Sequence, residues 1–268
     1  MNIFRLLKII SVFIMIGFSV SCTGIQGNIK APTPNAKAVN QNTVHRNGCG
    51  ISSLMNAYRF ASPKWHAATA KIPGSSDRAQ FNFLAKNYGS VGSKYTPGTR
   101  RWESRSGISS IDLKDLANDF QNKQGLWLPS LKLTTHYIQG NEPYTALLKR
   151  THRKLRSSLS SGFPPVLSIK HLAGSKIEGH IVILYEIPAS IPSNATSFPI
   201  KYVDPLGGRI KSGTIKIPGN VISSIDFSSG QLKLRKSRTL SMNLPQSDIA
   251  KRYRSTGDNI VLSASIAP

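Results

Sequence analysis

The spacing of apolar residues divides the chain into two halves. In the first half, apolar residues recur every three or four positions, which is the period of an amphipathic helix. This pattern predicts helices that begin at Cys49, near Asp77, within GISSIDLKDLANDFQNKQG and at Glu142. A glycine follows each of the last three and marks its end. The polar, glycine-rich segment 90–107 is predicted to be a loop.

The second half of the chain has the shorter period of β strands. Apolar residues there alternate or form short runs, which predicts successive strands at PPVLSIKHL, HIVILYEI, IKYVD, RIKSGTIKI and QLKLRKS. One earlier strand, LKLTTHYI, is expected between the last two helices. Near the carboxyl end we expect only a helical turn over 248–254 and an apolar piece over 260–263. Helices followed by strands are typical of an α+β fold with an antiparallel sheet.

The amino terminus has the features of an export signal. Arg5 and Lys8 precede the apolar run IISVFIMIGFSV, which is too short for a transmembrane helix, and small residues follow. The small residues before Cys22 resemble a bacterial lipoprotein signal, in which this cysteine is lipidated and anchors the mature protein in the membrane. A plain signal peptide, giving a periplasmic or secreted protein, is the alternative. We predict a signal peptide over 1–21, a flexible tether over 22–40 and one domain over 41–268.

The composition describes a basic, globular protein. Hydrophobic residues make up 39% of the chain, which excludes a disordered chain. The 35 Lys and Arg residues outnumber 12 acidic ones, so the formal net charge is +23. This balance favours contact with an anionic surface or polymer, although scattered basic residues also serve solubility. Nucleic acid is not expected as a partner, because no binding motif accompanies the charge and aromatic residues are only 8%.

Cys49 is the candidate nucleophile. If Cys22 carries a lipid, Cys49 has no intramolecular partner, and a lone thiol is a liability in an oxidising compartment. A buried core cysteine is the alternative explanation. Cys49 begins a predicted helix, and a helix N-terminus favours the thiolate. We expect Gly48 and Gly50 to leave room for a substrate carbonyl and for close backbone approach.

A thiol nucleophile needs an imidazole within hydrogen-bond reach. The chain has six histidines: His45, His66, His136, His152, His171 and His180. The best candidate is His180, which follows a glycine and opens a rigid apolar strand. The second choice is His171, which ends the preceding strand, whereas His136 and His152 fit surface or packing positions.

The partner of His180 follows from strand pairing. HIVILYEI and IKYVD form a predicted hairpin centred near Pro192, and His180 and Asp204 are equidistant from that centre. Alternation places His180 with Val182 on one face of its strand. A carboxylate at the end of the neighbouring strand accepts an imidazole N–H and fixes the tautomer. Taken alone, Asp204 also fits a turn residue before Pro205.

The motifs NGCGISSLMNA, GFPPVLSIK, EGHIVILYEI and YVDPLGG, in this order, resemble the papain-like cysteine peptidases of the bacteriocin-processing, double-glycine leader type. GISSIDLKDL also resembles a stretch of that family, and the likeness covers about residues 41–210. It implies a papain-like fold with N-terminal helices packed on an antiparallel sheet, followed by a C-terminal strand extension over 211–268.

The resemblance also implies a role for each motif. Cys49 would be the nucleophile, His180 the general base and Asp204 the acid that orients it. The family has an oxyanion-hole Gln six residues before its cysteine, where this chain has Thr43. Gln41 is the nearest glutamine and is assigned this role, with Asn42 beside it.

These features together predict an exported, lipid-anchored cysteine hydrolase of the bacterial cell envelope that cleaves amide bonds in a peptide or protein substrate. A peptidoglycan amidase or endopeptidase is the first alternative, because its anionic polymer substrate suits the charge. The second alternative is a non-catalytic binding lipoprotein on an inactive peptidase scaffold. No cofactor or metal is expected, since the histidines are dispersed without ligand spacing.

Overall fold

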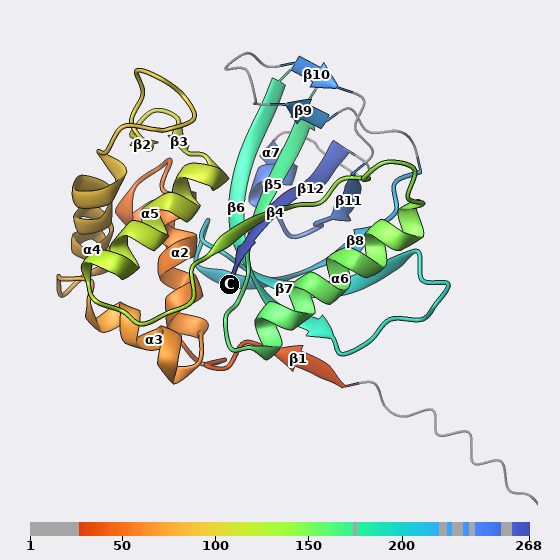
Figure 1. Cartoon of the computed structure of the whole chain (residues 1–268), viewed down its shortest axis with the longest axis horizontal. Helices are drawn as coiled ribbons and strands as arrows, with labels where there is room; N and C mark the ends of the chain where they lie inside the picture. Colours follow the sequence, from red (N-terminus) through yellow and green to blue (C-terminus); the bar gives the residue numbers. More distant parts are fainter. Residues whose placement is uncertain (1–26, 174–175, 220–223, 227–232, 236–238, 253–258) are drawn as a thin grey trace, which may run out of the picture.

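The computed structural model describes residues 27–173, 176–219, 224–226, 233–235, 239–252 and 259–268. The structure is 35% helical and 29% strand, and every strand pairing is antiparallel, which confirms the expected α+β class. Helices α2 to α5 lie on one side and the large sheet lies on the other, with α6 across it (Figure 1). The predicted signal peptide and Cys22 fall outside the described residues.

The helices lie close to their predicted positions. They are α1 (Gln41–Val44), α2 (Cys49–Phe60), α3 (Pro63–Ala70), α4 (Asp77–Leu84) with the π-helical turn η1 (Ala85–Gly89), α5 (Ser110–Lys123), α6 (Tyr144–Ser160) and α7 (Asp248–Arg252). The patterns beginning at Cys49, Asp77 and Glu142 correspond to α2, α4 with η1, and α6. Helix α3 was not predicted, because Trp65 and Ala68 are its only buried residues.

The strands are β1 (Asn28–Lys30), β2 (Trp102–Glu103), β3 (Gly107–Ile108), β4 (Lys132–Thr135), β5 (Val166–Ala173), β6 (Lys176–Pro188), β7 (Ser197–Asp204), β8 (Arg209–Lys216), β9 (Ser224–Asp226), β10 (Lys233–Arg235), β11 (Leu240–Asn243) and β12 (Ile260–Ala267). The short β2–β3 hairpin lies inside the segment predicted to be a loop. Strands β4 to β8 and β10 match the predicted strands, and the predicted apolar piece over 260–263 is the first half of β12.

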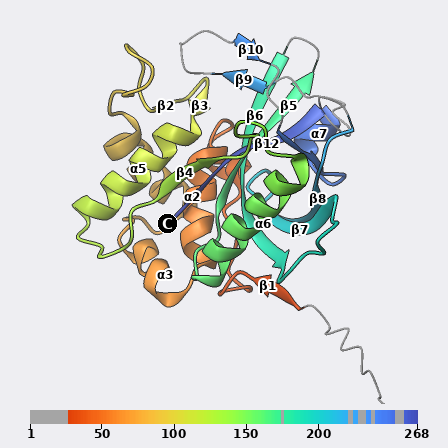
Figure 2. The ribbon, with the colours of Figure 1, turned by 45° about the vertical axis from the view of Figure 1, so that its right-hand side comes forward.

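Six strands close into a barrel. Strand β6 pairs with β5, and the pairing continues through β12, β11, β8 and β7 back to β6. Closure removes the free edges that an open sheet would leave, and side chains fill the interior of so small a barrel. Strand β4 adds to β12, and β1 adds to β6. Figure 2 shows α6 in front of these strands.

Two predicted boundaries are wrong. The segment 28–40 is not a free tether, because β1 pairs with β6 and the side chains of Ala31 and Val39 are buried. The segment 211–268 is not an added extension either, because β12 lies between β5 and β11 inside the barrel. In both cases a short apolar segment gains its structure from distant strands, which local periodicity does not report.

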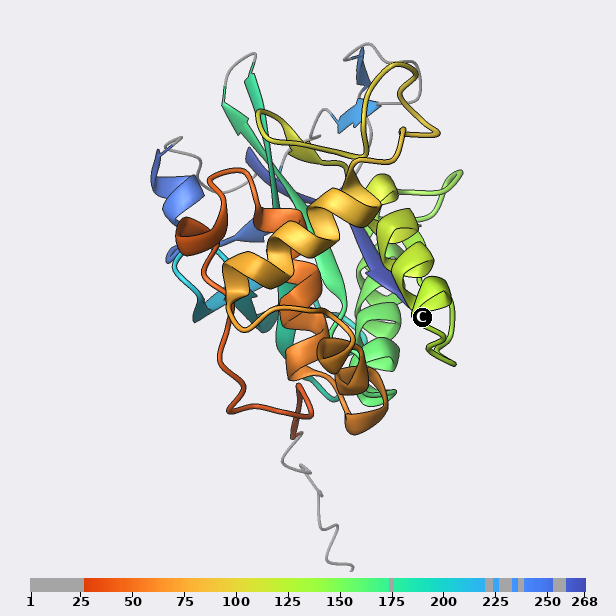
Figure 3. The same cartoon turned by 90° about the vertical axis from the view of Figure 1, so that its left-hand side faces the viewer.

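Helix α2 is the central helix. Its stripe of Ile51, Leu54, Met55 and Tyr58 is buried, and so is most of the rest of its surface. Ser53 Oγ donates a hydrogen bond of 2.7 Å to the carbonyl of Ile181 and fixes α2 to β6. Seen from the helical side, α4 lies in front of α2, and β5 and β6 rise behind it (Figure 3). No helix in the described part of the chain is long and apolar enough to cross a membrane.

His136 is a packing residue, as expected, and it makes folding sensitive to acid. Its ring is fully buried, with Nδ1 3.1 Å from Thr151 Oγ1 and Nε2 2.9 Å from Ser265 Oγ. Burial, and secondarily the charge of Arg150, lower the pKa of His136 from 6.5 to about 3. The folded state therefore holds this imidazole neutral at pH values where the unfolded chain is protonated.

We expect the free energy of unfolding to fall as the pH drops from 6.5 toward 3, by about 1.4 kcal/mol per pH unit for each such histidine. His136→Gln should lower the free energy of unfolding at pH 7. It should also reduce the slope of that free energy against pH, because the unfolded variant takes up about one proton fewer. Urea unfolding at pH 7.0, 5.5 and 4.5 measures both effects. His66→Gln, at an exposed position on α3, is the control that should keep the wild-type slope. An unchanged slope in His136→Gln would contradict the assignment.

Candidate active site

Cys49 is the first residue of α2 and is partly exposed. Gly48 is the N-cap residue and makes no side-chain capping bond, so the first turn of α2 keeps its backbone N–H groups near the thiol. These groups and the helix dipole stabilise negative charge. The thiol therefore lies at the positive end of the helix dipole, at a position that is partly open to solvent.

His180 lies on β6, opposite Ile169 of β5, and its side chain is 3% exposed. Its Nε2 donates a hydrogen bond of 2.8 Å to Asp204 Oδ1, and the same imidazole interacts with Cys49. Burial alone would lower the pKa of His180, but the hydrogen bonds with Asp204 and Cys49 outweigh burial and raise it to about 10. The structure thus brings together the three side chains predicted from the sequence.

Asp204 ends β7 and is fully buried. Its Oδ1 also accepts a hydrogen bond of 2.9 Å from the backbone N–H of Leu206. Burial would raise the pKa of Asp204, but the hydrogen bonds from His180 and Lys211 lower it to about 2. The carboxylate is therefore ionised at neutral pH and orients the imidazole.

The pairing register differs from the prediction by two residues. Ile183 lies opposite Val203, so the position opposite Asp204 is Val182 and not His180. His180 and Val182 share a face of β6, so the hydrogen bond joins diagonal neighbours on that face. The prediction assumed that the two strands pair symmetrically about Pro192. The observed pairs are not symmetric about that residue, and the register also shifts between Leu184 and Glu186.

Lys211 is a site residue that the sequence analysis missed. It lies opposite Tyr202 on β8, is 8% exposed, and its Nζ donates hydrogen bonds of 2.9 Å to Asp204 Oδ2 and Asp248 Oδ2. Burial would lower the pKa of Lys211, but the two carboxylates raise it. Its ammonium group holds the second oxygen of Asp204 and joins the acid to α7. In sequence it is one of many lysines in alternating strands, with no distinguishing signal.

A second missed residue is Lys170 on β5, which pairs with Gly179. A Cβ atom added to Gly179 would lie 3.1 Å from Lys170 Nζ, so this glycine makes room for the lysine. Burial lowers the pKa of Lys170, while the charges of Cys49 and Glu178 act against burial. A cationic group therefore lies within electrostatic range of the thiol.

His171, the second choice for the base, is fully buried. Neither ring nitrogen has a hydrogen-bond partner among the described residues. Burial and the charge of His180 lower the pKa of His171 to about 4, with Asp204 acting in the opposite direction. It is thus a neutral neighbour of the pair formed by His180 and Asp204.

Gln41 begins the short helix α1 and is 5% exposed. Its backbone N–H donates to the carbonyl of Pro205, just after Asp204, and its side-chain Nε2 donates a hydrogen bond of 2.9 Å to the carbonyl of Arg46. Gln41 therefore lies between the end of β7 and the loop that leads to Cys49. One amide hydrogen on Nε2 remains beyond this bond.

The two glycines beside Cys49 serve packing. A Cβ atom on Gly50 would lie 2.3 Å from Ile108 Cγ2, and one on Gly48 would lie 2.9 Å from the carbonyl of His45 and from Phe81 Cε2. Protein atoms therefore occupy the space beside Gly48 and Gly50 in which we expected clearance for a substrate carbonyl. The β2–β3 hairpin and α4 close against the start of α2 instead.

No protein-family model matches the chain, and no curated protein matches it. The chemistry of the site therefore has to be argued from its own geometry. Among the described residues no group of three or more His, Cys, Asp or Glu side chains could hold a metal ion. The site contains a thiol at a helix N-terminus, an imidazole next to this thiol, and an ionised carboxylate that accepts a hydrogen bond from the imidazole. These are the groups that nucleophilic acyl transfer requires.

Proposed function

We propose that this protein is an exported cysteine hydrolase with a papain-like fold that cleaves amide bonds of peptide or protein substrates. The observation that carries the proposal is the hydrogen bond of 2.8 Å between His180 Nε2 and Asp204 Oδ1, together with the interaction of the same imidazole with Cys49. It is supported by the place of the thiol at a helix start and by the order Cys, His, Asp along the sequence.

In this mechanism the Cys49 thiolate attacks the carbonyl carbon of the scissile amide while His180 is an imidazolium. The backbone N–H of Cys49 and the side-chain amide of Gln41 stabilise the oxyanion. The C–N bond breaks as His180 gives its proton to the leaving amine, which leaves a thioester on Cys49. His180 then takes a proton from water, the hydroxide attacks the thioester, and the acid product leaves as the thiol is restored.

The location is part of the same proposal. The short basic region, the apolar run and the small residues before Cys22 support export and a lipid anchor in a bacterial membrane. The net charge of +23 supports work beside the anionic envelope, which also keeps a peptidoglycan amidase or endopeptidase as the second candidate.

The test uses the full chain in detergent, incubated with a mixed peptide library and, separately, with purified cell-wall sacculi. Mass spectrometry of the products identifies new amine and carboxylate ends. Cleaved peptides support the peptidase, and cleaved sacculi alone support the cell-wall enzyme. Cys49→Ser is the matched control and should lose at least about 100-fold of either activity, because a serine hydroxyl is far less ionised than a thiol. No cleavage of either substrate would favour a binding protein on an inactive scaffold.

A further inference from the structure

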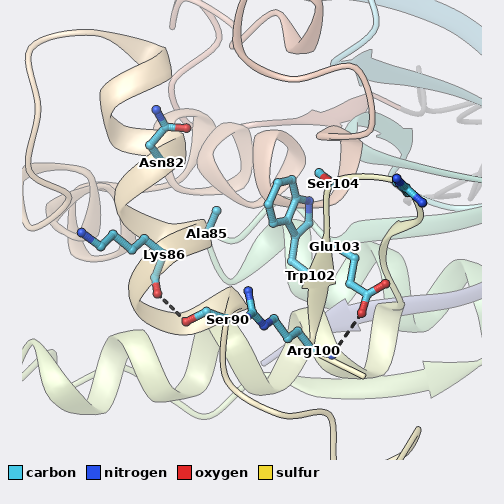
Figure 4. A pocket seen from close by; sticks show the side chains of 9 residues that line it. Asn82, Ala85, Lys86, Ser90, Arg100, Trp102, Glu103 and Ser104 are labelled. Carbon is cyan, nitrogen blue, oxygen red and sulfur yellow. Dashed lines mark hydrogen bonds between the residues drawn. The ribbon is translucent and has the colours of Figure 1, made fainter. Parts of the chain in front are cut away.

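A basic hollow lies beside the segment that leads to the nucleophile at the start of α2. It has a volume of about 720 Å³ between α4 with η1 and the β2–β3 hairpin. Lys86, Arg100 and Arg105 line it together with the indole of Trp102 (Figure 4). Given the proposed hydrolase function, the question is which part of a substrate fits this hollow.

The hollow and the nucleophile are held together by direct contacts. Asn47, two residues before Cys49, donates side-chain hydrogen bonds of 2.9 and 2.8 Å to the carbonyls of Ser104 and Arg105. The ring of His45 meets that of Trp102 edge to face at 5.0 Å. One wall of the hollow is therefore bonded to the segment that positions the thiol, so a chain bound at Cys49 can extend into it.

The cations of the hollow are available to a ligand. Lys86, Arg100 and Arg105 are exposed and form no ion pair with any residue that the structure describes. The one carboxylate in the lining, Glu103, turns toward its own hairpin, accepting from the backbone N–H of Arg100 at 3.4 Å and from Ser106 Oγ at 3.5 Å (Figure 4). The lining thus has a net positive charge.

Two further features make this more than a patch on a basic surface. The residue before the hairpin is bound to α5, because the Arg101 side chain is 1% exposed and its Nη1 lies 2.7 Å from Asp119 Oδ2. The flanking Arg100 and Trp102 are thereby held in place, which reduces the entropy lost on binding. The Trp102 Nε1 atom is buried and has no hydrogen-bond partner among the described residues.

We propose that this hollow is a substrate subsite that binds a carboxylate group of an acidic peptide whose scissile bond lies at Cys49. Arginine guanidinium groups match the planar carboxylate, and the indole packs on the adjoining apolar part of the peptide. This inference rests on the proposed function for the position of the scissile bond, but the binding of the peptide is measurable without turnover.

The test measures binding by fluorescence anisotropy to the full-chain Cys49→Ala variant in detergent. The probes are a labelled Glu-containing peptide and its Gln counterpart of the same length. We expect the Glu peptide to bind about fivefold to tenfold more tightly at low salt, as two exposed charge contacts would give, and to lose this preference as salt rises. Equal binding of the two peptides would overturn the proposal.

The variants locate the preference. Arg100→Gln/Arg105→Gln should abolish it. The matched control is Arg153→Gln/Arg156→Gln, which removes the same charge from a second hollow of about 430 Å³ on α6 and should keep the preference. Equal loss in both double variants would assign the effect to overall charge and overturn the subsite. If the acidic peptide binds in the hollow but wild-type protein cleaves neither this peptide, the peptide library nor the sacculi, the carboxylate-binding site stands and the proposed hydrolase function fails.

Discussion

Replacing His180 with alanine should slow alkylation of Cys49 by iodoacetamide about 100-fold at pH 6.5, because an ordinary thiol with a pKa of about 8.5 is only about 1% ionised there. In the wild type, the buried imidazolium beside the thiol favours the thiolate. The raised pKa of His180, about 10, keeps the imidazolium charged across neutral pH. The wild-type labelling rate should therefore change little between pH 6 and 9. It should change only as His180 loses its proton, when the pH rises through about 10.

The variant should follow a different pH curve, with the labelling rate rising about tenfold per pH unit up to about pH 8.5 as an ordinary thiol does. Peptide mapping by mass spectrometry assigns the label to Cys49 and separates it from Cys22. His66→Ala, at an exposed histidine on α3, should leave the wild-type curve unchanged. Equal labelling rates in wild type and His180→Ala at pH 6.5 would show that the imidazole does not activate the thiol.

Asp204→Asn should cost about 3–5 kcal/mol of unfolding free energy at pH 7, because the buried His180 imidazolium loses its carboxylate and the buried Lys211 ammonium keeps only Asp248. His180 and Lys211 are 3% and 8% exposed, and both donate to this side chain at 2.8 and 2.9 Å. The asparagine keeps the shape and still accepts from Leu206, so the loss reports charge more than packing. Urea unfolding measures it.

The sign of the pH dependence gives an independent check. The pKa of Asp204 is lowered from 3.8 to about 2, so its contribution is fully present above pH 3.8 and is lost as pH falls through about 2. The difference between wild type and Asp204→Asn should therefore be nearly as large at pH 5 as at pH 7. A difference that disappears by pH 5 would contradict an ionised, paired Asp204.

A double-mutant cycle separates the role of Lys211. Removing the lysine together with the carboxylate, in Asp204→Asn/Lys211→Met, should recover about 1–3 kcal/mol relative to the sum of the single changes, because each single change already breaks the Asp204–Lys211 ion pair. Asp77→Asn, in the more exposed ion pair with Arg59, is the control and should cost less than about 1 kcal/mol. Additive losses at Asp204 and Lys211 would refute the coupling.

Local pattern was sufficient for much of this molecule. The period of apolar residues identified α2, α4, α5 and α6 and most strands of the sheet, because burying one face of a helix or strand leaves a regular trace in the sequence. It also placed Cys49 at a helix start. Strand alternation put His180 and Asp204 on faces that meet, and this pairing held although the register moved by two residues.

What the sequence left open depended on contacts between distant segments. Closure of the barrel by β12, the pairing of β1 with β6, and the salt bridge of Lys211 with Asp248 join residues far apart in the chain. Such contacts leave no regular spacing of apolar residues in the sequence, because each needs only one suitable residue in each of the two segments. The sequence by itself thus determined most of the element types and the three side chains that meet at the candidate site. Only the tertiary structure decided the strand order, the buried cation behind Asp204 and the basic hollow beside Cys49. Each of these depends on which elements pack together, and the local sequence pattern of an element does not report its packing partners.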